Sequence, residues 1–353
     1  MKYRGVVYDV GLNFTGDGFS VEPFNPNLVE HDMRAIRQDL YANAVRIEGE
    51  EIHRLETAAR IAHAMGLTVL FNPWKMNADV EDTRSYMELA AITAEKLRSD
   101  GVDIVFVAGC EYTIFSKGVF PGNNLNERLQ FLTSHFADAQ SMDKMPEPLV
   151  EKSVKLNKIL GSFVEVIRAN FKGLVTYSAG LWEKVEWDIF DIVGVDYYRH
   201  GETEEQYVAG LERYRSADKP FLVMEVGCCA YEGAAARGAG GFMVLKGRNP
   251  DGSGIFEDGV VPTRSEREQA DYVGTQLGLL ADANVQGVFI YVFSFPCMPT
   301  GEGASDLDLA CYSLVKTFPN SDTRSKSIPP WAPKESFQRV AEIYRSMTEL
   351  EEK

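Results

Sequence analysis

The hydrophobic residues of this chain gather in eight short runs that recur along its whole length. The runs are rich in Val, Ile and Phe and do not alternate strictly with polar residues. Such runs are typical of parallel strands covered on both faces, because both sides of each strand are then buried. The predicted strands are Tyr3–Val10, Ala44–Ile47, Thr68–Phe71, Asp103–Ala108, Leu174–Tyr177, Ile192–Tyr197, Phe221–Met224 and Gly287–Val292.

Most segments between these runs carry apolar residues at helical spacing, which predicts a helix after most strands. Gly66 and Gly101 stand just beyond two of these segments, where helices commonly end. Ser265 and Glu268 fit a capping box at the start of a later helix. Only the link 182–190 is too short for a full helix. The apolar positions of the other predicted helices lie within 28–40, 52–65, 86–97, 156–167 and 337–344.

This alternation of strands and helices in 353 residues predicts a (β/α)8 TIM barrel. The alternative is a doubly wound open sheet, but the glycines of residues 11–18 lack the spacing of its phosphate-binding turn. We expect a single domain over residues 1–353, with no linker. Long loops at about 115–148 and 227–262 follow the fourth and seventh strands, and long loops of this kind usually shape a substrate cleft.

Composition and charge narrow the choice of partners. The chain is 45% hydrophobic and 25% charged, as in globular proteins, and its net charge of -16 argues against nucleic acid and anionic membranes. No apolar run is long enough to span a membrane. The five cysteines are an odd number, so we expect no disulfide framework and a cytoplasmic location. The first predicted strand begins at Tyr3, so we expect no signal peptide. The oligomeric state is not indicated.

Two glutamates stand where apolar strands end. Glu111 follows the fourth predicted strand and Glu225 follows the seventh. The carboxyl ends of parallel strands form the edge where α/β folds build active sites. Either residue alone could be a solvated loop residue or part of a helix cap. Two carboxyl groups on different strands are, however, what cleavage of a glycosidic bond needs, as an acid and as a nucleophile or base.

The order of several short motifs resembles clan A glycoside hydrolases, the retaining (β/α)8 glycosidases with one catalytic glutamate after strand four and another after strand seven. The motifs are 43–47, 191–198, 220–227 and 333–344. The resemblance implies that Glu111 is the acid/base and Glu225 the nucleophile. It also implies that Arg46 supports the nucleophile and that Tyr198 lies beside it. The expected activity is hydrolysis of a β-glycosidic bond by double displacement, without a cofactor or metal, on a neutral oligosaccharide or a small glycoside.

Two of these assignments have structural alternatives. Arg46 could form an ion pair that only stabilises the barrel. Tyr197 and Tyr198 are neighbours on a strand, so one points into the barrel and the other toward the helices. The motif favours Tyr198 as the inward residue.

The chain departs from the family at two positions. Cys110 precedes Glu111 where the family usually has asparagine, which contacts the 2-hydroxyl of the sugar. A thiol bonds weakly, so the sugar is unusual at C2, another residue serves C2, or catalysis is weak. The eighth strand offers Tyr291 or Phe293 in place of the usual tryptophan.

Further candidates for sugar contacts follow other strands. Trp74, Trp182 and Tyr231 are aromatic residues near strand ends, where rings can stack on sugars, although packing beneath loops is the commoner role. We expect one or two of them to be sugar platforms. Polar candidates for contacts with sugar hydroxyls are Asn72 and Lys75, which flank Trp74, and Asp9.

Other chemistries find less support in the sequence. The five histidines form neither His-x-His nor His-Glu-x-x-His, which disfavours a zinc hydrolase. The adjacent Cys228 and Cys229 cannot easily chelate one ion or form an unstrained disulfide. The alternative function is a catalytically weak or inactive barrel that binds a carbohydrate or a protein partner. The sugar, the linkage and endo or exo action are not indicated.

Overall fold

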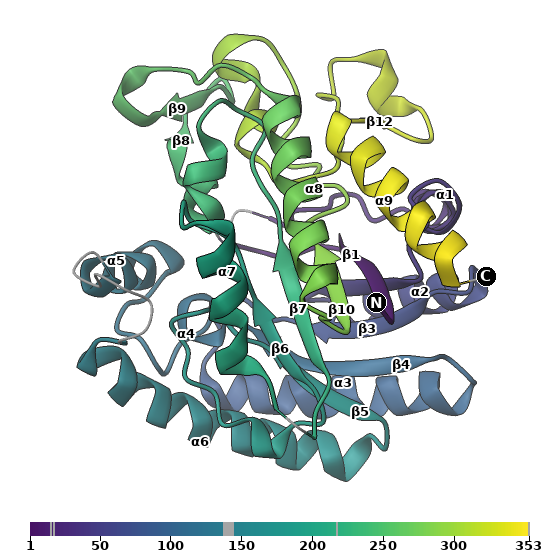
Figure 1. Ribbon diagram of the computed structural model, residues 1–353, viewed down its shortest axis with the longest axis vertical. Coiled ribbons are helices and arrows are strands. Elements are labelled where there is room, and N and C mark those ends of the chain that lie inside the picture. The colour runs from purple at the N-terminus through teal and green to yellow at the C-terminus, as the bar shows by residue number, and fades with distance from the viewer. Residues whose placement is uncertain (15, 17, 137–144, 217, 352–353) are drawn as a thin grey trace.

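The computed structural model describes residues 1–14, 16, 18–136, 145–216 and 218–351. Its main sheet has eight parallel strands in the order β5-β4-β3-β2-β1-β10-β7-β6. A parallel bridge between Ala179 and Val195 joins the two ends of this order. The sheet therefore closes on itself with helices outside, which confirms the predicted (β/α)8 TIM barrel (Figure 1).

Each predicted strand is present, but several run further than the apolar pattern indicated. Strands β2, β3 and β7 continue two residues beyond the predicted ends and include Glu48, Asn72 and Glu225. An apolar run stops at the first polar residue, whereas backbone pairing continues through it. The barrel strands are β1 (Tyr3–Asp9), β2 (Ala44–Gly49), β3 (Thr68–Pro73), β4 (Ile104–Cys110), β5 (Leu174–Ser178), β6 (Val193–Asp196), β7 (Phe221–Val226) and β10 (Gly287–Ile290).

The helices follow the predicted periodicity. Between β5 and β6 the described chain has only the short 3-10 helix η1 (Trp187–Ile189), as the length of that link predicted. Helix α7 (Glu204–Gly210) and η2 (Leu211–Tyr214) fill the gap between β6 and β7. Helices α8 and α9 lie side by side in Figure 1. The predicted helices are α1 (Pro26–Gln38), α2 (Ile52–Ala64), α3 (Val80–Ser99), α6 (Glu147–Asn170), α8 (Glu266–Asp282) and α9 (Glu335–Glu351).

Only half of the predicted capping box forms at the start of α8. The Ser265 hydroxyl accepts a hydrogen bond from the backbone N–H of Glu268, as a cap should. The Glu268 carboxylate does not return to Ser265, because it accepts the backbone N–H groups of Gly233 and Ala235, both at 2.9 Å. Glu268 therefore ties the loop after β7 to α8.

Three long connections extend from the barrel, one more than the sequence predicted. The third joins β10 to α9 over residues 291–334, and its buried Asp308 pairs with Arg264 at 2.8 Å and Lys334 at 2.9 Å. The connection after β4 holds α4 (Tyr112–Phe115) and α5 (Leu125–Phe136), while its residues 137–144 lie outside the described residues, as do 15 and 17 of the turn after β1. The connection after β7 contains η3 (Ala234–Ala236), η4 (Gly238–Val244), β8 (Leu245–Arg248), β9 (Gly254–Phe256) and η5 (Glu257–Gly259). The third connection contains η6 (Gly303–Ser305), η7 (Leu307–Ala310), β11 (Val315–Thr317), η8 (Thr323–Lys326) and β12 (Trp331–Pro333).

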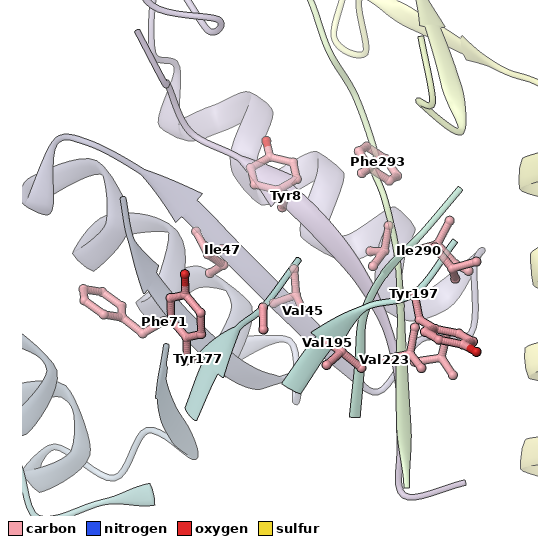
Figure 2. Packing of buried hydrophobic residues seen from close by; sticks show 14 of the residues in the cluster. Tyr8, Val45, Ile47, Phe71, Tyr177, Val195, Tyr197, Val223, Ile290 and Phe293 are labelled. Carbon is pink, nitrogen blue, oxygen red and sulfur yellow. The ribbon is translucent and has the colours of Figure 1, made fainter. Parts of the chain in front are cut away.

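The core has two layers, and alternation along the strands assigns residues to them. Val45 and Ile47 belong to the large cluster between strands and helices, part of which Figure 2 shows. Val7 and Leu70 belong to a smaller cluster of strand residues inside the barrel. Arg46 lies between Val45 and Ile47 and is in register with Val7 and Leu70, so its side chain lies on the inner side of the barrel.

Asp32 of α1 gives the fold a pH-dependent contact. Its carboxylate accepts hydrogen bonds from the Tyr8 hydroxyl and the Trp331 indole, both at 2.8 Å. Burial raises the pKa of Asp32 from 3.8 to about 7, although both donors act in the opposite direction. Between these values the folded chain holds a proton that the unfolded chain has lost, so the free energy of unfolding should fall as the pH rises from about 4 to about 7.

Asp32→Asn should flatten this part of the pH dependence, because the group no longer titrates. Urea unfolding at several pH values measures the slope. Asp39→Asn, at the exposed C-terminal end of the same helix, is the control and should retain the wild-type slope. Equal slopes in both variants would contradict the assignment to Asp32.

Candidate active site

Buried acidic side chains gather at the carboxyl ends of the barrel strands around one arginine. Asp9 and Asp196 are the last residues of β1 and β6, and Glu48 and Glu225 are next to last in β2 and β7. All four are buried, as is Arg46. The parallel arrangement brings strand ends together, so polar residues far apart in the sequence meet at one edge of the barrel.

Arg46 uses all five of its N–H donors. Its Nη2 lies 2.8 Å from Glu225 Oε1 and 3.0 Å from Glu48 Oε2. Arg46 thus pairs with the proposed nucleophile and also joins several strands, so its two predicted roles are both compatible with the structure. The other three donors reach Asn72 Oδ1 at 2.9 Å, Ser178 Oγ at 3.1 Å and the Met224 carbonyl at 3.0 Å.

Glu225 is held through both carboxylate oxygens. Oε1 accepts from Arg46, and Oε2 accepts from the Tyr198 hydroxyl at 2.9 Å. Tyr197 points the other way, where its hydroxyl donates to the Tyr207 carbonyl at 2.8 Å. The structure therefore places Tyr198 beside Glu225, and the carboxylate is fixed from two sides.

Cys110 lies beside the same carboxylate. Its Sγ is 3.5 Å from Glu225 Oε1 and 3.6 Å from Asp196 Oδ2. Burial, followed by the carboxylates of Asp196 and Glu225, raises the pKa of the Cys110 thiol well above its ordinary value. Cys110 is thus a neutral thiol with a single proton, which can be donated to only one of the two carboxylates at a time.

Asp196 is an acidic neighbour that the sequence analysis did not identify. Its Oδ1 accepts the Ser178 hydroxyl at 2.6 Å and lies 3.7 Å from Arg46 Nη1. Burial, then the charge of Glu225, raises the pKa of Asp196 well above its usual range. Glu48 and Ser178 were also missed. The available signals were the two-residue spacing from Arg46 to Glu48 and the positions of Ser178 and Asp196 at strand ends.

Glu111 stands directly after β4 in an unusual backbone conformation. Its φ of 42° and ψ of 46° lie in the left-handed region, which glutamate rarely adopts. Burial raises the pKa of Glu111 well above its usual range, and the charges of Asp196 and Glu225 add to the effect. The carboxyl group therefore keeps its proton at higher pH, as a general acid requires.

Three tyrosine rings line the neighbourhood of Glu225. The ring of Tyr312, from the third long connection, lies 5.9 Å from that of Tyr198 and 6.0 Å from that of Tyr291. Tyr291 and Tyr312 are partly exposed. Phe293, the other aromatic candidate from the eighth barrel strand, β10, is buried with its ring 5.5 Å from Trp331 on the helix side. Of these two candidates, Tyr291, directly after β10, is therefore the aromatic residue that lies near the site.

Trp74 packs next to Cys110 in a small aromatic cluster. Its ring meets Phe115 edge-on at 4.7 Å and Phe14 at 6.2 Å. Among the described residues its buried indole N–H finds no hydrogen-bond partner. A buried donor without a partner is costly, so a water molecule or a ligand oxygen is expected there.

The other aromatic candidates are engaged in loop packing. Trp182 donates its indole N–H to Thr113 Oγ1 at 2.8 Å, in the turn after Glu111. The hydroxyl of Tyr231 donates to the Gly241 carbonyl at 2.8 Å within the loop after β7. These contacts are those expected of residues that support loops around the site.

The polar candidates differ in how many of their polar atoms already have a hydrogen-bond partner in the protein. The Oδ1 of Asn72 is bound to Arg46. Asp9 accepts the Gly11 N–H at 2.7 Å through Oδ1, and burial raises its pKa to about 7. Its Oδ2 has no partner within the described chain. Lys75 contributes its carbonyl, which accepts the Ser116 hydroxyl at 3.3 Å.

Within the described residues, one set of side chains has the spacing of metal ligands. Donor atoms of Cys110, Asp196 and Glu225 lie within 4.8 Å of one another. A sulfur with two carboxylate oxygens suits zinc. Such an ion would bind the Glu225 carboxylate, which Arg46 and Tyr198 already hold through its two oxygens.

Comparison with solved structures shows that the (β/α)8 fold of this chain is similar to that of several glycosidases. A GH113 β-1,4-mannanase matches with a TM-score of 0.57 at 15% identity, covering 98% of this chain and 100% of the other. The GH113 β-mannanase AaManA from Alicyclobacillus acidocaldarius, in complex with ManMIm, gives 0.56 at 17%, covering 98% and 97%. GH5_18 from Streptomyces cattleya, in complex with GlcNAc, gives 0.57 at 12%, covering 98% and 80%.

Comparisons at the level of sequence give no match. No family model matches the chain, and no curated protein matches it. The structural matches have low identity, so they establish the fold and leave the substrate to chemical argument. No helix in the described part of the chain combines the length and apolarity needed to cross a membrane.

Proposed function

We propose that this protein is a retaining glycoside hydrolase that cleaves a β-glycosidic bond in a neutral oligosaccharide or small glycoside. The observation that carries the proposal is the contrast between two glutamates on different strands. Glu225 is bound on both oxygens by Arg46 and Tyr198, whereas the pKa of Glu111 is strongly raised. Two carboxyl groups in such different surroundings are suited to separate roles in acid–base chemistry.

Each group then has a defined step. Glu111 gives its proton to the leaving oxygen while a Glu225 oxygen attacks the anomeric carbon and forms a covalent glycosyl-enzyme. Glu111, now a carboxylate, takes a proton from the water that releases the sugar. Arg46 and Tyr198 orient the attacking carboxylate. Retention requires the two carboxyl groups to lie about 5–5.5 Å apart, which remains a prediction for this pair.

The engagement of Arg46 supports a neutral substrate. All five of its N–H donors already bind acceptors of the protein. An acidic sugar would therefore find no free donor on this arginine. The partly exposed ring of Tyr291 supports stacking on an uncharged sugar face.

A comparison of leaving groups tests the role of Glu111. Glu111→Ala should retain most activity on aryl glycosides with good leaving groups, which need little protonation, and lose it on poor ones. Azide should restore turnover and give the β-glycosyl azide, because it attacks the intermediate without needing a base. Glu186→Ala, an exposed glutamate on the loop after β5, is the control. Equal losses on all substrates would contradict the assignment.

Cys110→Asn tests the position next to the acid. If Cys110 stands where an amide would contact the 2-hydroxyl, asparagine should raise kcat on ordinary glycosides by roughly tenfold, since a missing polar partner is worth about 1–3 kcal/mol. A substrate crowded at C2 should lose rate instead. Cys297→Asn, at a half-buried cysteine of the third long connection, is the control. Unchanged rates with both substrate types would mean that Cys110 only fills space.

The second candidate function is carbohydrate binding with little turnover, and the thiol of Cys110 beside Glu225 is what favours it. A thiol is a weak hydrogen-bonding group, so the transition state loses a contact there. Calorimetric titration with oligosaccharides, alongside aryl glycoside assays, separates the two functions. Tight binding without hydrolysis would support the second.

A further inference from the structure

The turn that follows Glu111 is capped from elsewhere in the chain. Helix α4 begins at Tyr112, so Glu111 is its N-cap residue, yet the Glu111 side chain makes no capping hydrogen bond. The first backbone N–H groups of a helix have no partner within it and are usually satisfied by the N-cap side chain. Those of Tyr112 and Thr113 therefore need another acceptor.

Glu183, on the loop after β5, supplies that acceptor. Its Oε1 accepts the backbone N–H of Thr113 at 3.0 Å and the Thr113 hydroxyl at 2.7 Å. Its Oε2 accepts the Tyr177 hydroxyl at 2.9 Å and the Gly180 N–H at 3.2 Å. The Tyr177 hydroxyl in turn accepts the N–H of Tyr112 at 2.7 Å. One buried carboxylate thus caps α4 directly and through Tyr177.

This arrangement fixes Glu111 from both sides of its strained backbone. A non-glycine residue in the left-handed region is strained and persists only where its surroundings impose it. On one side, the Glu111 N–H donates to the Ser178 carbonyl at 2.9 Å. On the other, Glu183 and Tyr177 hold the next two residues. The carboxyl group of Glu111 is left available for proton transfer.

Glu183 also acts on Glu111 through its charge. Burial raises the pKa of Glu183 to about 7, although its four donors oppose the rise. Its charge raises the pKa of Glu111 further, after the effects of burial, Asp196 and Glu225. A buried carboxylate close to a proton donor strengthens the donor's hold on its proton.

We propose that Glu183 is a positioning residue for the proton donor Glu111, capping α4 in place of the Glu111 side chain. This inference rests on the proposed function, in which Glu111 is the acid. Glu183 is buried and both of its carboxylate oxygens are engaged by donors of the protein. It acts by holding the turn after Glu111 and by its negative charge.

Glu183→Gln tests this inference, because it keeps the size of the side chain and removes the charge. We expect kcat/KM to fall about tenfold on aryl glycosides with poor leaving groups and to change less than twofold on good ones. The alkaline limb of the pH profile should move to lower pH by roughly 0.5–1 unit, since the loss of a negative charge lowers the pKa of Glu111. Glu186→Gln, an exposed glutamate on the same loop, should do neither.

Tyr177→Phe separates the positioning effect from the charge. It removes the hydroxyl between Glu183 and the Tyr112 N–H but keeps the carboxylate. Activity on poor leaving groups should fall, while the alkaline limb stays in place. If Glu183→Gln does not fold, this variant decides, and losses that are equal on all leaving groups would overturn the inference.

The outcome for Glu183 is distinguishable from a failure of the proposed function. If the wild type does not turn over, or Glu111→Ala shows no dependence on the leaving group, the proposed function fails. If Glu111→Ala behaves as expected but Glu183→Gln matches Glu186→Gln, only the role of Glu183 is wrong. Circular dichroism of each variant checks that it is folded.

Discussion

Glu225→Ala is expected to abolish turnover of every glycoside, by about 10⁴-fold or more. Without the carboxylate no covalent intermediate can form, and a good leaving group cannot compensate for that loss. Steady-state rates on a series of aryl glycosides measure the effect. The loss should be the same across the series, unlike that of Glu111→Ala.

The product formed with azide separates the two glutamates. In Glu225→Ala, azide would attack the substrate directly and give the α-glycosyl azide, the opposite anomer to that from Glu111→Ala. Glu232→Ala, an exposed glutamate on the loop after β7, should keep wild-type rates. Substantial turnover by Glu225→Ala without azide would show that another residue is the nucleophile.

Arg46→Met should have the largest effect on stability, a loss of about 3–5 kcal/mol in the free energy of unfolding. Arg46 is fully buried, and its removal leaves the carboxyl groups of Glu48 and Glu225 without their cation. Removing one member of a buried ion pair exposes the full cost of burying the other. Urea unfolding near neutral pH measures the loss.

A surface arginine provides the matched control. Arg34 pairs with Glu30 at 2.7 Å, but both side chains are about half exposed. Arg34→Met should therefore change stability by less than about 1 kcal/mol. Equal losses in the two variants would contradict this expectation.

Much of the fold could be predicted because it rests on local patterns. Apolar runs located all eight barrel strands, and helical spacing located most helices. The third long connection was missed, because its only strands in the described chain are one short pair, Val315–Thr317 with Trp331–Pro333. Its structure depends on long-range contacts, among them the pairing of Asp308 with Arg264.

In the candidate site, too, residues in local motifs were predicted and a residue that depends on a distant contact was missed. Glu111, Glu225, Arg46 and Tyr198 were identified because each belongs to a motif at a strand end, and the structure brings Arg46, Glu225 and Tyr198 into contact. Glu183 was missed because its role depends on a turn 70 residues earlier in the chain. No periodicity in the sequence indicates such a contact.

Aromatic residues show the limits of reasoning by type. Trp74 and Trp182 both follow barrel strands and were equal candidates. In the structure the indole of Trp182 is bound to Thr113, whereas that of Trp74 has no partner within the described residues. The difference lies in the loops that cover each ring, which the identity of the residue does not reveal.

The left-handed backbone at Glu111 also bears on how this barrel responds to mutation. Glycine adopts that conformation without strain, so the fold alone would favour glycine there by about 1 kcal/mol, while only the chemistry requires a carboxyl group. Selection for thermal stability alone would therefore drive position 111 toward a residue that cannot donate a proton. A variant selected for stability could therefore become more stable through a substitution at position 111 and lose its activity in the same step.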